Sequence, residues 1–126
     1  MATTQTVTKA WKSGSQAISK SKDLTDAAEL KVDITIATAI TDQLTPLAIS
    51  ATKTTVLYLV SDVDLTLKTN NSGTPQETIA LTAGNPLVWD STAYHAIPFA
   101  GDVTAIYLTN ASGQQGNVNV RVLYHP

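Results

Sequence analysis

The amino-acid sequence predicts an all-β chain folded as a single antiparallel β-sandwich, jelly-roll-like, with an extended N-terminal arm. Threonine, which is stiff at its first side-chain torsion and suits pleated structure, occurs 20 times, whereas residues that fill helices are scarce. Roughly ten short segments alternate apolar and polar residues, with turn residues about every eight to twelve positions. At 126 residues the chain fits one domain with one hydrophobic core.

Residues 1–22 are expected to form a basic, Ser/Thr-rich arm or a pair of edge strands, ahead of a sandwich domain over residues 23–126. Four lysines precede the first acid in the chain: Lys9, Lys12, Lys20 and Lys22. An arm of this kind can dock on an acidic partner or on a neighbouring copy, with Lys9, Trp11 and Lys12 as contacts. Lysines that keep an exposed edge strand from aggregating are an equally good explanation.

Within the arm, residues 5–12 alternate weakly, the Ser-Gly-Ser at residues 13–15 can turn, and residues 17–20 can return as a partner strand. Residues 23–29 predict one helical turn, because Asp26 and Glu29 have the spacing of a capping box.

Three strands are predicted in the first half of the sandwich domain. Residues 30–36 alternate strictly, which is typical of a half-buried strand. The strand over residues 44–50 contains Pro46, whose missing N–H confines it to an edge strand or to a strand start. Residues 55–61 are apolar on both faces and predict a strand buried between two layers.

The second half continues in the same pattern. Its strands are predicted over residues 64–69, 78–82, 87–89, 102–109 and 118–124, with an irregular crossing over residues 90–101. Six residues of 62–73 (Asp62, Val63, Thr69, Asn70, Ser72 and Gly73) recur forty positions later within 102–113, and each copy ends in Thr-Asn-x-Ser-Gly. The echo is explained by an internal duplication or by two similar hairpins in one sandwich. Two such hairpins favour a jelly roll, with the immunoglobulin-like class as the alternative.

The turns that end the two copies are candidate contact loops. They consist of Asn70, Asn71, Ser72 and Gly73 in the first copy, and Asn110, Ala111, Ser112 and Gly113 in the second. Asparagine tolerates the left-handed backbone conformation, and we expect Gly73 and Gly113 to adopt positive φ.

The sequence predicts no catalytic residue, no metal site and no cofactor. A triad can be written from Ser91, His95 and either Asp90 or Asp102, but neither a Gly-x-Ser-x-Gly elbow nor a glycine-rich oxyanion loop accompanies it. Asp62 and Asp64 could offer carboxylates to Ca²⁺, although an exposed strand entry explains them as well. Cysteine is absent, which excludes thiolate ligands and a cysteine nucleophile.

Composition also bears on partners. The formal net charge of −2 removes the attraction on which non-specific nucleic-acid binding rests. The sequence has no run long enough to span a membrane and no N-terminal apolar core of a secretory signal. We therefore expect no nucleic-acid and no membrane partner, and synthesis in a cytoplasm without signal-directed export.

Four stretches resemble small all-β virion proteins of tailed bacteriophages, over about residues 6–124. They are LTLKTNNSG at 65–73, NPLVW at 85–89, DVTAIYLTN at 102–110 and NVNVRVLY at 117–124. The resemblance implies a non-enzymatic virion subunit, a head decoration or cement protein that binds the major capsid protein or another virion protein, often as a homotrimer. The alternative is a tail or head appendage that recognises a host-surface glycan through an aromatic platform of Trp89 and Tyr94.

Overall fold

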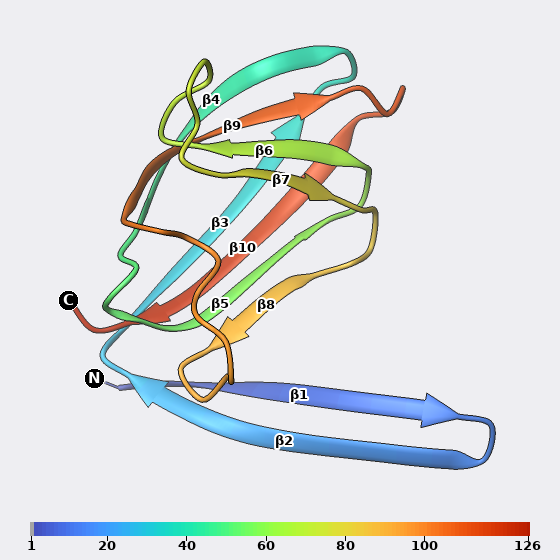
Figure 1. Cartoon of the computed structure of the whole chain (residues 1–126), viewed down its shortest axis with the longest axis vertical. Coiled ribbons are helices and arrows are strands. Elements are labelled where there is room, and N and C mark those ends of the chain that lie inside the picture. Colours follow the sequence, from blue (N-terminus) through green and yellow to red (C-terminus); the bar gives the residue numbers. More distant parts are fainter. Residues whose placement is uncertain (1) are drawn as a thin grey trace.

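The structure is a computed structural model that describes residues 2–126, which contain ten strands and no helix. Figure 1 shows their arrangement. The strands are β1 (Thr3–Ser13), β2 (Gln16–Asp26), β3 (Ala28–Ile36), β4 (Ile40–Ile49), β5 (Thr54–Ser61), β6 (Leu65–Thr69), β7 (Thr78–Leu81), β8 (Leu87–Asp90), β9 (Val103–Asn110) and β10 (Gly116–Tyr124). All of their pairings are antiparallel, so the all-β, antiparallel prediction is confirmed.

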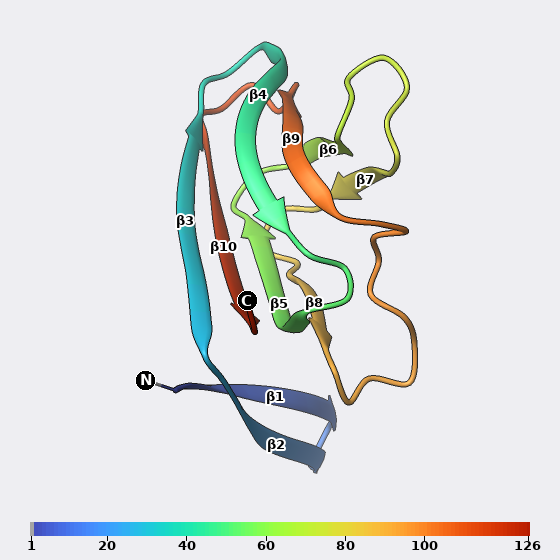
Figure 2. The ribbon, with the colours of Figure 1, turned by 90° about the vertical axis from the view of Figure 1, so that its left-hand side faces the viewer.

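Eight of the strands form two four-stranded sheets, in the orders β3-β10-β5-β8 and β4-β9-β6-β7. The sheets face each other across a common interior (Figure 2). Their pairings are nested along the chain, because β3 pairs with β10, β4 with β9, β5 with β8 and β6 with β7. The chain from β3 to β10 therefore follows the path of one long antiparallel hairpin, whose turn lies between β6 and β7. This hairpin is folded so that its strand pairs alternate between the two sheets.

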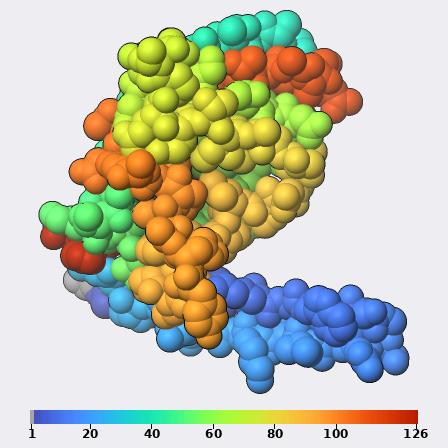
Figure 3. Space-filling view, in the orientation of Figure 1, coloured from blue at the N-terminus to red at the C-terminus, as the bar shows by residue number. Residues whose placement is uncertain are grey.

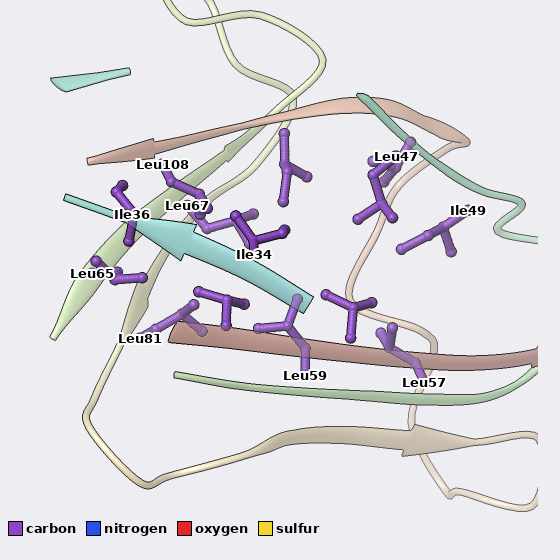
Figure 4. Close-up of a cluster of buried hydrophobic side chains, with 14 of the residues drawn as sticks. Ile34, Ile36, Leu47, Ile49, Leu57, Leu59, Leu65, Leu67, Leu81 and Leu108 are labelled. Atoms are coloured by element: carbon purple, nitrogen blue, oxygen red, sulfur yellow. The ribbon is translucent and has the colours of Figure 1, made fainter. Parts of the chain in front are cut away.

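The core lies between the two sheets and consists of aliphatic side chains and Phe99; along strands such as β3, β6 and β10 its residues alternate with less buried ones. Figure 4 shows part of it, namely Ile34, Ile36, Leu47, Ile49, Leu57, Leu59, Leu65, Leu67, Leu81 and Leu108. Because a slip of one residue would turn a whole apolar set towards water, this alternation fixes the register of each strand.

Strands β4 and β5 behave as their sequences indicate. Pro46 lies in β4, which is an edge strand of its sheet. In β5, Leu57 and Leu59 enter the core, whereas Val56 is buried on the other face against Leu24 and Leu123. The second layer over β5 is thus supplied by the β1–β2 hairpin, which forms a two-stranded sheet of its own.

The helical turn predicted over residues 23–29 is wrong. Strand β2 continues to Asp26, and β3 begins at Ala28 after a single bend. Extended backbone is favoured here because Thr25 pairs with Thr4 across the hairpin and because it places Leu24 in a buried apolar cluster. The division of the chain into an arm and a sandwich domain after residue 22 stays a prediction. Strand β2 continues through that position to Asp26.

The two copies of the forty-residue echo lie side by side. Strands β6 and β9 are neighbours in one sheet, with Leu67 opposite Leu108. Gly113 has the expected positive φ of 83°, but the expectation for Gly73 is wrong, because Asn70 adopts the left-handed conformation in that copy, with φ of 66°.

Candidate functional site

The β1–β2 hairpin has two faces of different character. Residues that pair directly across the strands project on the same face. One face carries a ladder of hydrogen-bonded side chains, which joins Thr4 to Thr25 (2.7 Å), Thr6 to Asp23 (2.6 Å) and Thr8 to Ser21 (2.8 Å). We call the other the apolar–basic face; from base to tip its pairs are Gln5–Leu24, Val7–Lys22, Lys9–Lys20 and Trp11–Ile18.

The base of the apolar–basic face attaches the hairpin to the sandwich. Leu24 is buried against Val56 of β5 and Leu123 of β10, and Val7 packs on the same cluster. This small cluster lies on the outer face of the β3-β10-β5-β8 sheet, separate from the main core.

An ion pair adds a second attachment. Lys9 Nζ lies 3.1 Å from Asp90 Oδ2 at the end of β8, and the Asp90 side chain is buried. Burial raises the pKa of Asp90, but the hydrogen bonds from Thr92 and Lys9 outweigh it, so that pKa lies below its ordinary value. Asp90 therefore stays ionised and holds Lys9 against the sandwich.

Asp26 fixes the bend between the hairpin and β3. Its Oδ1 accepts the N–H of Ala27 at 2.8 Å, and its Oδ2 accepts the hydroxyl of Thr55 at 2.5 Å. His125 Nδ1 lies 3.3 Å from the same Oδ2. The hydrogen bonds from Thr55 and Ala27 hold the pKa of Asp26 below its ordinary value. One carboxylate thus links the hairpin base to β5 and to the C-terminal residues.

The tip half of the hairpin extends beyond the sheets (Figures 1 and 3). Trp11 and Ile18 pair across its strands and are 53% and 59% exposed. Of the predicted arm contacts, Trp11 and Lys12 lie on this projecting part, whereas Lys9 is held by Asp90.

Two grooves lie next to the hairpin and the C-terminus. The β1 groove, of about 610 Å³, runs along β1 and is floored by Val56, Tyr58, Pro86 and Val88. The C-terminal groove, of about 310 Å³, is lined among others by Ala48, Ile49, Lys53, Asp102, Val122 and Tyr124.

The first candidate loop is held internally by its asparagines. Asn70 Oδ1 accepts the N–H of Thr104 at 2.7 Å, and its amide donates to the carbonyl of Asp102 at 2.9 Å. Asn71 Oδ1 accepts the N–H of Gly73 at 2.8 Å. These bonds tie β6 to the start of β9 and leave Asn71 and Gly73 exposed at the surface.

The second loop depends on Asn110, which is fully buried. Its amide donates to the carbonyls of Ala37 (3.2 Å) and Gln114 (2.7 Å), and its Oδ1 accepts the hydroxyl of Ser112 at 2.6 Å. Asn110 is therefore a structural residue, whereas Ala111, Ser112 and Gly113 are exposed.

The two rings of the proposed glycan platform line different surfaces. Trp89 packs against the main core, and its indole N–H donates to the carbonyl of His95 at 2.9 Å. Tyr94 is fully exposed and lies beside Lys20 and Asp90 of the hairpin attachment.

The acidic and histidine candidates make separate contacts. Asp102 accepts the N–H of Ala51, and Asp62 accepts the N–H of Asn117 at 2.7 Å, which lowers its pKa. Asp64 accepts the N–H of Ala83. Among residues 2–126, no group of three or more histidine, aspartate or glutamate side chains is placed to hold a metal ion. This part of the chain also has no helix of the length and apolarity that crossing a membrane requires.

Sequence reasoning missed three features of this region: the outer cluster, the role of Asp26 and the C-terminal groove. The adjacent apolar residues Val56-Leu57 and Val122-Leu123 were a signal for the outer cluster, because each pair buries one side chain on each face of its strand. The other two features depend on contacts between distant segments, which no local pattern encodes.

In comparisons with known proteins, no family model matches this chain, and neither a curated protein nor a solved structure matches it.

Proposed function

We propose that the sandwich is a jelly roll and that the chain is a non-enzymatic structural subunit of a bacteriophage virion, a decoration or cement protein on the assembled head. The observation that carries this proposal is the nested pairing of β3–β10, β4–β9, β5–β8 and β6–β7. Rolling up a long hairpin in this way produces the two-sheet architecture of jelly rolls, which is common in viral capsid and lectin domains.

The projecting hairpin supports attachment to other proteins. Each of its strands pairs with the other along one edge only, within residues 3–26, so both outer edges can accept a further strand. Strand addition uses backbone hydrogen bonds and makes little demand on the partner's sequence. Weak contacts of this kind, repeated over a lattice of identical sites, sum to firm attachment.

The two candidate loops provide a second contact surface. The loop after β6 and the turn after β9 lie at the end of the sandwich opposite the hairpin (Figures 1 and 2). A subunit with contact surfaces at both ends can bind the shell with one and a neighbouring subunit with the other. Self-association as a trimer, with the major capsid protein as the shell partner, is the arrangement we propose.

The test is cryo-electron microscopy of head particles from the source phage, with the coding region of this chain intact or deleted. We expect density for the sandwich on intact heads, its loss from deleted heads, and its return when purified chain is added back. Heads that lack this density, together with chain that does not sediment with them, would overturn the proposal.

The glycan-binding appendage remains a second candidate because Tyr94 is fully exposed beside a groove. Stacking on an exposed ring is a common way to hold a sugar. A glycan array probed with the wild-type chain and with Tyr94→Ala separates the two functions. Binding that disappears in Tyr94→Ala would favour the appendage, whereas an array without signal would leave the decoration function in place.

A further inference from the structure

The tip of the apolar–basic face is unexplained by the fold of a single copy. Trp11 and Ile18 lie opposite each other and keep more than half of their surfaces exposed, next to the Lys9–Lys20 pair. Exposed apolar side chains that gather beside charged ones are typical of protein contact sites. Three of the five pairs on the other face consist of polar side chains that hydrogen-bond one another, and that face carries no large apolar side chain.

This exposed tip continues a face that already binds a sandwich. Nearer the base, Leu24 and Val7 of the same face pack on Val56 and Leu123, and Lys9 binds Asp90. Beyond that point the hairpin has left its own sandwich (Figure 3). The apolar and basic groups at the tip therefore suit a surface of the same kind, apolar with a carboxylate at its rim, supplied by another molecule.

Charge favours a second copy of this chain as that molecule. The hairpin, residues 3–26, carries four lysines and two aspartates, a net charge of +2, whereas residues 27–126 carry eight acids and four basic residues, a net charge of −4. A hairpin is thus attracted to the sandwich of another copy. Two hairpins would repel each other, so the contact joins two different surfaces.

The C-terminal groove is a matching surface on the sandwich. Ala48, Tyr124 and Pro126 give it an accessible apolar lining above the buried Ile49 and Val122, and the exposed carboxylate of Asp102 also lines it, together with Lys53 and His125. The C-terminus and the hairpin tip lie on opposite sides of the molecule (Figure 1). A head-to-tail arrangement needs this placement, and it closes into a ring if the rotation between copies allows.

We propose that Trp11 and Ile18 of one copy dock in the C-terminal groove of the next, with Lys20 near Asp102. This inference rests on the self-association part of the proposed function and names its two surfaces. It concerns the purified chain alone, so its test is independent of attachment to a shell.

The first experiment measures the mass of the full chain by light scattering and sedimentation over a range of concentrations. We expect wild type to be oligomeric, the double variant Trp11→Ala/Ile18→Ser to be monomeric, and high salt to weaken the wild-type assembly. The matched control is Ala10→Ser/Ala17→Ser, on the opposite face of the hairpin, which should assemble as wild type. A monomeric wild type, or a double variant that still assembles, overturns the inference.

The second experiment identifies the two surfaces. Because the chain has no cysteine, copies with Ile18→Cys and copies with Ala48→Cys can be mixed and oxidised. Head-to-tail docking predicts a disulfide-linked dimer in the mixture and little in either variant alone. Cross-linking only between two Ile18→Cys copies would overturn it. If heads bind this chain while it stays monomeric in solution, the shell function survives and the docking inference fails.

Discussion

The β1–β2 hairpin and the sandwich are held together by different forces. Every residue from Lys9 to Asp23 in the hairpin is exposed, and its strands are joined by backbone pairing and a ladder of hydroxyl groups. The sandwich encloses aliphatic side chains from eight strands. Because an isolated two-stranded hairpin is at best marginally stable in water, the hairpin depends on the sandwich, whereas the sandwich core contains none of its residues.

The difference in burial between the two regions distinguishes residues that stabilise the fold from exposed residues that can bind another molecule. In the sandwich, an apolar residue that faces inward contributes burial energy, so its identity is explained by folding. At the hairpin tip, Trp11 and Ile18 pair across the strands but stay 53% and 59% exposed, so they bury much less surface than an inward-facing core residue. Their exposed surfaces are free for the contact with another molecule that we propose.

The largest expected effect is in the sandwich core. Leu67 is fully buried in β6, and Leu67→Ala should lower the free energy of unfolding by about 2 to 5 kcal/mol, because burial is lost and a cavity is left. Trp11→Ala, the hairpin comparison, should stay within about 0.5 kcal/mol of wild type, as most exposed substitutions do. Urea denaturation followed by circular dichroism measures both. Equal losses would contradict the division between the two regions.

The attachment between the regions comes next. Leu24→Ala should lower the free energy of detaching the hairpin from the sandwich by about 1 to 3 kcal/mol. Leu24 is buried in a small cluster, whose side chains can partly fill the space that the substitution leaves. We expect amide hydrogen exchange to accelerate throughout β1 and β2 while the amides of β6 and β9 keep their protection. Uniform acceleration in both sheets and the hairpin would show that the hairpin is part of the cooperative core.

Most of the sandwich could be predicted from the sequence because burial on one face imposes alternation. Residues 30–36 and 102–109 were predicted as strands and are β3 and β9, to within two residues. Pro46 confined its strand to a sheet edge or to a strand start because it lacks an N–H, and β4 is an edge strand. The order of the strands within the sheets could not be predicted from alternation. Alternation shows which side chains of a strand face the core, but it does not show which strands lie next to each other.

The details of the candidate site were hidden for the same reason. Leu24 lies in a polar segment, and its burial depends on Val56 and Leu123, which are distant in the sequence. The spacing of Asp26 and Glu29 suggested a capping box, but Asp26 is used to hold the bend through Thr55. Local propensity was overruled by these long-range contacts.

Two glycines, one in each region, allow a matched comparison with a smaller expected effect on stability. Gly113 in the sandwich and Gly14 in the hairpin turn have φ of 83° and 58°, and a Cβ added at either would meet no atom within 4 Å. Valine at either position therefore adds only backbone strain, on the order of 1 to 2 kcal/mol. Gly113→Val should lower the denaturation midpoint, whereas Gly14→Val should fray the hairpin tip and leave the midpoint unchanged. An unchanged midpoint in Gly113→Val would contradict the strain argument.

The smallest expected effect is the loss of stability at low pH that follows from protonation of Asp90 in the Lys9–Asp90 pair. The pKa of Asp90 in the folded chain lies below the ordinary value of 3.8, so Asp90 contributes stability above pH 3.8 and loses it as the pH falls through the folded-state pKa. Because Lys9 is largely exposed, we expect the pair to contribute no more than about 1 kcal/mol. Urea unfolding measured between neutral pH and pH 3 follows this loss.

Asp90→Asn isolates that contribution, since asparagine has nearly the shape of a protonated aspartate. The difference in unfolding free energy between wild type and Asp90→Asn should be largest near neutral pH and shrink as the pH falls below 3.8. Asp33→Asn is the control within the sandwich, because the pKa of Asp33 is lowered by Arg121 and Asn119 of β10. Both variants should reduce the loss of unfolding free energy that wild type shows as the pH falls. Only Asp90→Asn should speed amide hydrogen exchange in β1 at neutral pH. Unchanged exchange in β1 would mean that the outer cluster alone attaches the hairpin.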